Sequence, residues 1–160
     1  GVVSLILMIL VNKRNRELLN INVKELVLIN EMSMTIGLVM LTIGNFLGGM
    51  WANESWGRYW GWDPKETWAL ISIMVYAFVI HMRLIPGLKS NFAFTVASIL
   101  SFGSIIMTYF GVNFYLAGLH SYAKDDQEIS LVFISITLVI ISILSFLAYP
   151  KYKKYLKNNR

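Results

Sequence analysis

Long apolar runs separated by short polar segments make up most of this chain, and the pattern predicts an all-α membrane protein. A bilayer core about 30 Å thick needs roughly 20 apolar residues in a helix. Four complete or near-complete spans meet this requirement, at residues 26–50, 64–84, 91–116 and 129–149. Residues 1–11 are apolar but too few to cross, so we expect a partial N-terminal span. The prediction is a polytopic membrane helix bundle.

Local signals place several ends of these helices. The segment 63–66 (DPKE) is typical of a helix start, with Asp63 as N-cap and Glu66 reaching back to the cap. Proline disfavours helix continuation, so Pro150 should end the last span. Glu31 lies near the start of the first complete span, and we expect it at the membrane interface.

Composition supports the membrane class and excludes several chemistries. The chain is 56% hydrophobic and 14% charged and contains no cysteine, which excludes disulfides, thiolate metal sites and a cysteine nucleophile of its own. We find no nucleotide-binding glycine loop, no Ser-His-Asp pattern and no zinc spacing. Asp63 and Glu66 could form a catalytic acid pair, but the capping role already accounts for both.

Charge asymmetry predicts how the chain is oriented. If every span crosses, eleven of the 14 Lys and Arg residues lie on one side, and Arg58, Lys65 and Lys124 lie on the other. The positive-inside rule makes the first side cytoplasmic or its equivalent. The net charge of +5 therefore indicates topology rather than nucleic-acid binding. The polar loop at 51–68 should face the outside.

That loop holds all five tryptophans of the protein. An interfacial aromatic belt would account for one or two of them, such as Trp51 and Trp68. It does not account for 56–62, where glycines alternate with indoles. Glycine lets a planar ligand approach the backbone, and indoles offer stacking faces. The loop therefore predicts a flat, apolar, aromatic partner.

The two histidines are candidate iron ligands. His120 follows a span directly and should lie level with the tryptophans, although a solvated histidine is the simpler alternative. His81 lies near the end of an apolar helix, where hydrogen bonding at the headgroups is the alternative. It comes 18 residues after Asp63, or ~27 Å along a helix. The two imidazoles should therefore lie on opposite sides of the membrane and serve separate sites.

The segment from Trp56 to Trp68 (WGRYWGWDPKETW) resembles the tryptophan-rich WWD signature of the heme-handling proteins of cytochrome c biogenesis. Further matching motifs are Trp51-Ala52-Asn53, His81 followed by Arg83, Gly111-Val112-Asn113 and the GLHSYA segment at 118–123. With these the chain is similar to the CcsA/ResC type of the System II cytochrome c synthase, found alone or as the C-terminal half of a fused CcsBA protein.

The resemblance implies export and handling of heme b (iron protoporphyrin IX) and its attachment to apocytochrome c outside the membrane. It implies a heme lyase component that joins the heme vinyls to the thiols of a CxxCH motif. His120 would be an axial ligand of the external heme and His81 of a transmembrane heme. The implied heme platform in the loop comprises Trp51, Trp56, Gly57, Tyr59, Trp60, Trp62, Asp63 and Trp68.

The chain departs from the family in one respect. Family members have more spans and two further histidines upstream, so each implied iron site is half-built here. We therefore expect a single transmembrane domain over 1–160 that is the C-terminal fragment of a longer protein and binds heme weakly or not at all alone.

The expected partners are apocytochrome c, heme, a CcsB/ResB-type protein, fused or separate, and the lipid bilayer, with no nucleic acid. A bacterial inner membrane with the loop facing the periplasm is favoured over a thylakoid. The alternatives are a WWD protein that passes heme to a chaperone, and a non-catalytic membrane-anchoring subunit.

Overall fold

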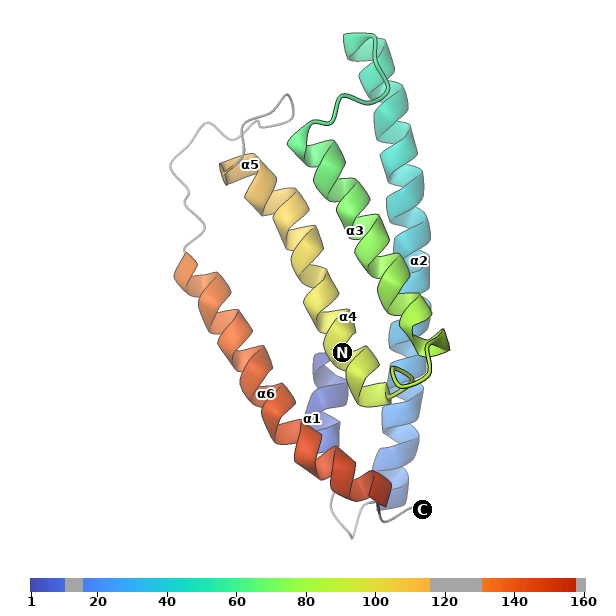
Figure 1. The fold of residues 1–160 in the computed structure, drawn as a ribbon, viewed down its shortest axis with the longest axis vertical. Coiled ribbons are helices and arrows are strands. Elements are labelled where there is room, and N and C mark those ends of the chain that lie inside the picture. The colour runs from blue at the N-terminus through green and yellow to red at the C-terminus, as the bar shows by residue number, and fades with distance from the viewer. Residues whose placement is uncertain (11–15, 116–130, 158–160) are drawn as a thin grey trace. The chain divides into compact units, whose positions relative to one another are not determined.

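The computed structural model describes residues 1–10, 16–115 and 131–157, and in these ranges it contains helices and connecting turns but no strand (Figure 1). The elements in chain order are α1 (Val2–Leu10), α2 (Arg16–Trp56), α3 (Pro64–His81), the 3-10 turn η2 (Met82–Leu84), α4 (Asn91–Ile106), the π-helical turn η3 (Met107–Gly111), α5 (Val112–Tyr115) and α6 (Leu131–Lys157).

Four helical segments among the described residues are long and apolar enough to cross a membrane. They are Asn22–Trp56, Pro64–Leu84, Asn91–Gly111 and Ser135–Lys153. Large apolar side chains lie exposed along α2 and α6, for example Phe46 and Phe146, as suits helices that face lipid. The predicted all-α polytopic membrane bundle is confirmed, and the chain is an integral membrane protein.

The first complete span is longer than the sequence predicts. The tryptophan loop was expected to begin at Trp51, but α2 continues to Trp56, so the first two tryptophans are helical. No glycine or proline interrupts the helix between Met50 and Trp56, and hydrogen bonding continues until a residue leaves the helical conformation. The non-helical loop between α2 and α3 is therefore residues 57–63.

The chain divides into two compact units, of which unit 1 comprises Gly1–Met32, Met82–Ile99 and Ser130–Arg160. In this unit α1 packs against α6 (Figure 1). Leu5 is fully buried on α1, and Met8 is 1% exposed. The Lys151 ammonium donates to the Ile9 carbonyl at 2.8 Å, which caps the C-terminal end of α1.

The prediction that Pro150 ends the last span is wrong, because α6 continues through it to Lys157. A proline inside a helix removes one backbone hydrogen bond, and membrane helices tolerate that loss where neighbours support them. Here Phe92 of α4 packs against Tyr149 at 5.6 Å and Tyr152 at 6.1 Å between ring centroids, on either side of the proline. These contacts anchor the final turns.

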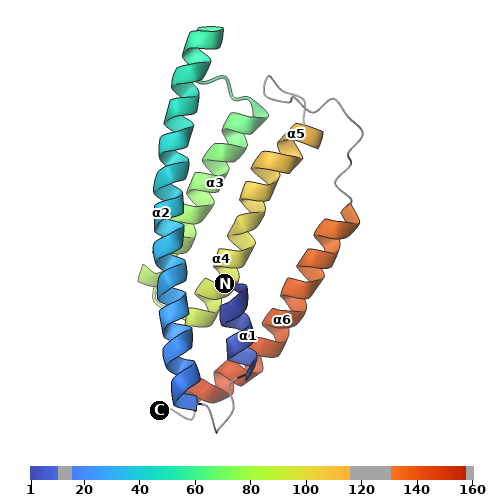
Figure 2. The ribbon, with the colours of Figure 1, turned by 180° about the vertical axis from the view of Figure 1, so that it is seen from behind.

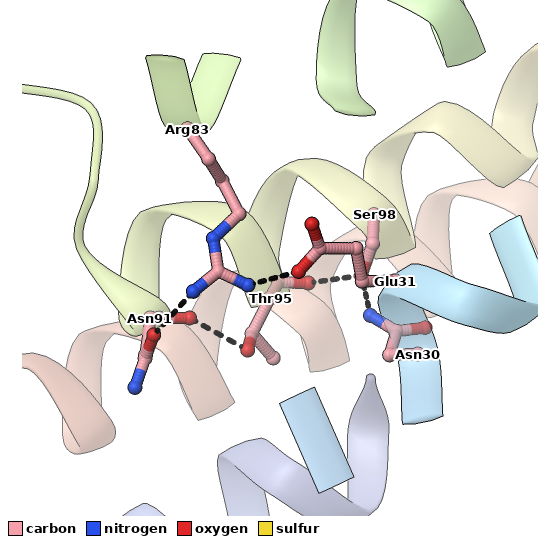
Figure 3. Close-up of polar contacts among 6 residues, drawn as sticks. All are labelled: Asn30, Glu31, Arg83, Asn91, Thr95 and Ser98. Carbon is pink, nitrogen blue, oxygen red and sulfur yellow. Dashed lines mark hydrogen bonds and ion pairs between the residues drawn. The ribbon is translucent and has the colours of Figure 1, made fainter. Parts of the chain in front are cut away.

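Polar side chains from α2, η2 and α4 meet in unit 1, where those of Arg83 and Glu31 are partly buried (Figure 3). The Arg83 guanidinium forms an ion pair with Glu31 and donates to Asn91 Oδ1 at 3.4 Å. It also lies 5.3 Å from the centre of the Phe94 ring. Glu31, expected at the membrane interface, is thus held by a cation from a distant part of the chain.

Unit 2 comprises Ser33–His81 and Leu100–Ile129. In it α3 packs against the π-helical turn η3 and α5 (Figure 2). The Thr108 hydroxyl in η3 lies 2.9 Å from the Ser72 hydroxyl and 3.1 Å from the Trp68 carbonyl on α3. The wider π turn thus brings the Thr108 hydroxyl within hydrogen-bonding distance of two groups on α3.

Candidate functional site: an aromatic platform

The loop of the tryptophan platform begins where α2 ends, after Trp51 and Trp56 in the last turns of that helix. Gly57 has a positive φ of 69°, and its N–H donates to the Asn53 carbonyl at 2.9 Å. This is the left-handed helix cap that glycine adopts without the penalty of a side chain. The cap turns the chain out of α2 and into the loop 57–63.

A reciprocal capping box closes the loop at α3, as the sequence predicts. The Asp63 carboxylate accepts the Lys65 N–H at 3.2 Å, and the Asp63 carbonyl accepts the Thr67 N–H at 2.9 Å. The Glu66 carboxylate reaches back to the Asp63 N–H at 3.2 Å. Asp63 is buried, with 7% of its surface exposed. The N-cap prediction is therefore confirmed.

The Glu66 carboxylate makes a second bond that the capping motif does not predict. The same oxygen accepts the Gly61 N–H at 2.7 Å, so it holds the residues on both sides of Trp62. Trp62 itself has a φ of 56°, in the left-handed region that bulky residues rarely enter. Glu66 therefore clamps a strained tryptophan between two hydrogen bonds.

The two hydrogen bonds to Glu66 leave the Trp62 side chain exposed on the surface of the protein. The Trp62 side chain is 72% exposed, more than any other tryptophan among the described residues. A large apolar side chain held in a strained backbone and left uncovered contributes little to packing. Strain of this kind points to a functional contact with a ligand or partner.

The tryptophans form two edge-to-face pairs. Trp60 and Trp62 lie 5.8 Å apart at an interplanar angle of 88°, and Trp51 and Trp56 lie 5.1 Å apart at 81°. Perpendicular indoles provide an exposed ring face beside an N–H edge. The structure thus groups four of the predicted platform residues into pairs, whereas Trp68 lies half-buried on α3, with its carbonyl against Thr108.

Two glycines let loop side chains lie close to the backbone. A side chain at Gly49 would meet the Tyr59 carbonyl oxygen at 3.3 Å, so Tyr59 packs back against α2 while its side chain stays 58% exposed. A side chain at Gly61 would occupy the space that the Arg58 guanidinium fills. The sequence predicts that Gly61 leaves space for a ligand, whereas in the structure the Arg58 guanidinium occupies that space.

The base of the platform is a polar contact between α3 and α5. The Lys65 ammonium donates to Asn113 Oδ1 at 3.3 Å. Asn113 follows the π turn, in which the Met107 side chain lies against Gly111, so a side chain at Gly111 would displace Met107. In the sequence Lys65 and Arg58 contribute only charges, and nothing in their spacing signals these contacts.

His81 is the last residue of α3, and its side chain is exposed. Its Nδ1 lies 2.7 Å from the Ala77 carbonyl and therefore donates to it, because a carbonyl can only accept. That bond fixes the tautomer with a lone pair on Nε2, the form in which histidine binds metals. No group of three His, Asp or Glu side chains that could hold a metal ion occurs within residues 1–10, 16–115 and 131–157. The other predicted ligand, His120, lies outside the described residues.

Comparison with known proteins places these features among cytochrome c assembly proteins. The family model described as cytochrome c assembly protein matches residues 1–120. Protein NrfI of Wolinella succinogenes is 62% identical over 104 residues, which is 65% of this chain and 12% of that protein. The cytochrome c biogenesis protein CcsA of Cyanophora paradoxa is 51% identical over 88 residues, or 55% of this chain and 27% of that protein. CcsA of Cuscuta reflexa is 48% identical over 102 residues, or 64% and 33%. The chain therefore spans a third or less of the length of these relatives.

Proposed function

This chain belongs to the cytochrome c assembly protein family, and from that premise we propose that its platform binds heme b for attachment to apocytochrome c. Membership of this family gives the chain a role in cytochrome c assembly. The finer steps proposed here are heme binding by the loop, iron ligation by the histidines and thioether formation.

The observation that carries the proposal is Trp62. Its side chain is 72% exposed and its backbone is strained, and the Glu66 clamp holds it so. A porphyrin is a flat aromatic ring, and stacking on an indole buries one face of each ring. The neighbouring Trp60, perpendicular to Trp62, would contact the porphyrin edge. The chemistry of these side chains therefore fits the proposed substrate.

His81 fits the role of an axial ligand. Its imidazole is exposed, and its Nε2 carries the lone pair that iron requires, since Nδ1 is committed to Ala77. His81 ends α3 whereas the platform precedes α3, and an 18-residue helix is ~27 Å long. The proposal therefore has two heme positions, one transmembrane at His81 and one external at the platform, with His120 as the external ligand.

The proposed reaction adds a thiol to a vinyl group. The cysteine S–H of the CxxCH motif adds across the vinyl double bond, forming one C–S and one C–H bond with no net oxidation. The heme iron stays reduced and the thiols belong to apocytochrome c, which is consistent with the absence of cysteine here. The residues of this chain would bind and orient heme while a CcsB/ResB-type partner completes the complex. We place the platform on the outer side of a bacterial inner membrane, on the charge asymmetry of the sequence.

The test compares two equally exposed aromatic residues in the full-length protein that contains this chain. Trp62→Asn removes the stacking face while asparagine tolerates the left-handed backbone. Phe46→Ala is the matched control, because Phe46 is also 72% exposed in unit 2 but lies on the apolar face of α2. We expect Trp62→Asn to lower bound heme and cytochrome c synthesis, and Phe46→Ala to change neither. Equal heme content and synthesis in both variants would refute the platform.

His81 is tested by chemical rescue. His81→Ala should deplete the transmembrane heme, and added imidazole should restore the absorption bands of ligated heme by supplying the missing nitrogen. Unchanged heme spectra in His81→Ala without imidazole would show that the histidine has no ligand role.

A further inference from the structure

Among the residues that the structure describes, no carboxylate forms an ion pair with the cations of the platform, and this feature extends the proposed function. In the described residues of unit 2, Arg58 and Lys65 are the Lys and Arg side chains present. Neither forms an ion pair with a described residue. The acids beside them, Asp63 and Glu66, direct their carboxylates to backbone N–H groups of the capping box.

Both cations are positioned by specific neighbours. The Arg58 guanidinium rests in the space that a side chain at Gly61 would occupy, next to the Trp60 and Trp62 pair in sequence. The Lys65 ammonium is oriented by Asn113 at 3.3 Å, and this bond uses one of its three donors. Both side chains are partly buried rather than fully extended into solvent. Arg58 therefore keeps its donors against Gly61, which lies between Trp60 and Trp62 in sequence, and Lys65 keeps two donors in the first turn of α3.

The proposed substrate supplies the missing anions. Heme carries two propionate carboxylates, which are ionised at neutral pH like other carboxylic acids. An indole surface alone would bind the ring and leave these charges unpaired, which is costly near a membrane. Arginine and lysine are the side chains that pair with carboxylates in such settings.

We propose that Arg58, seated on Gly61, and Lys65, oriented by Asn113, bind the two propionate carboxylates of heme and so fix its orientation on the tryptophan platform. This inference rests on the proposed function of the platform and adds the residues that recognise the acidic edge of the porphyrin. An oriented heme presents the opposite, vinyl-bearing edge outward, which is the edge that the thiols must reach.

The test uses metal-free protoporphyrin IX and its dimethyl ester, so that iron ligation plays no part. Binding to the full-length protein in detergent is followed by quenching of tryptophan fluorescence. In this chain the tryptophans all lie within residues 51–68, so quenching of these residues reports the platform. The variants are Arg58→Gln, Lys65→Gln and Gly61→Ala, the last of which displaces Arg58 without removing it. Lys89→Gln is the control, because Lys89 is an exposed cation of unit 1.

The protein without substitutions should bind the acid about a hundredfold more tightly than the ester, with each cation contributing about tenfold. Arg58→Gln, Lys65→Gln and Gly61→Ala should each reduce that preference about tenfold while leaving ester affinity unchanged, and Lys89→Gln should keep it. Retained ester affinity also shows that a variant is folded. The charge-keeping Lys65→Arg should preserve part of the preference.

The experiment distinguishes failure of the propionate assignment from failure of the proposed function. Tight and equal binding of acid and ester by the protein without substitutions would overturn the propionate assignment and leave the platform standing. Binding of neither porphyrin would overturn the proposed function together with this inference. An acid preference that all the variants retain would also overturn the assignment.

Discussion

Replacing Glu66 by alanine should release Trp62 from its strained conformation. One carboxylate oxygen of Glu66 accepts N–H groups from Gly61 at 2.7 Å and from Asp63 at 3.2 Å. Bonds to charged groups contribute about 1.5–3 kcal/mol when well buried. Glu66 is only partly buried, so we take about 2 kcal/mol for the two bonds together. Against this loss, relaxation of Trp62 from the left-handed region returns about 1–2 kcal/mol.

These opposing terms predict a small change in overall stability and a large change in the loop. The free energy of global unfolding should fall by about 1 kcal/mol or less, because the strain relieved offsets the bonds lost. In Glu66→Ala the Gly61 and Asp63 N–H groups lose their acceptor, so local opening of the loop becomes easier. Exchange of these two amide hydrogens should therefore accelerate about 5- to 30-fold. Platform heme binding should weaken as Trp62 loses its fixed orientation.

Amide hydrogen exchange measured by mass spectrometry over the loop 57–65 is the assay, with thermal unfolding in detergent beside it. Glu66→Gln should be milder, because its remaining carbonyl oxygen can accept both N–H groups. Glu54→Ala is the control, since Glu54 is an exposed carboxylate of the same unit on α2. If Glu66→Ala exchanges at the unsubstituted rate while Trp62 keeps its position, the clamp does not hold the loop.

Three other substitutions test the framework. Gly111→Ala should be less stable than Gly103→Ala by about 1 kcal/mol, because its side chain would force the Met107 side chain to shift, whereas Gly103 lies in open space. Equal melting temperatures for both would contradict the packing of the π turn. Glu31→Gln should lower the free energy of unfolding by about 1–2 kcal/mol, because it leaves Arg83 without its carboxylate. In a double-mutant cycle, adding Arg83→Gln should recover part of that loss. Additive losses would argue against the ion pair. Gly57→Ala should cost about 1 kcal/mol in chemical denaturation because φ is 69° there, and no change would argue against the left-handed cap.

The sequence by itself determined the membrane class, the order of the spans and the start of α3. Apolar length decides whether a helix can cross a bilayer, and that property is local to each segment. The capping box at Asp63 and Glu66 is local as well, because both partners lie within one turn. The clustering of all tryptophans in residues 51–68 is likewise a property of the sequence alone, and it predicts an aromatic surface at this loop.

Tertiary structure decided the features that depend on distant partners. Pro150 does not end α6, because Phe92 supports the turns on both sides of it. Glu31 is paired with Arg83, 52 residues away, which no local pattern indicates. Local sequence signals fix helix ends and spans within a few residues, whereas long-range contacts depend on how segments pack, and packing is encoded across the whole chain.

The same division applies within the platform. Sequence placed the indoles in one loop, but the second bond of Glu66, to Gly61, and the left-handed backbone of Trp62 emerge only in three dimensions. A backbone conformation is set by the hydrogen bonds that surround it, and these overrode the preference of tryptophan for negative φ. What the sequence determined is the aromatic content of the platform, and what the fold decided is which indole is exposed and which backbone conformation holds it.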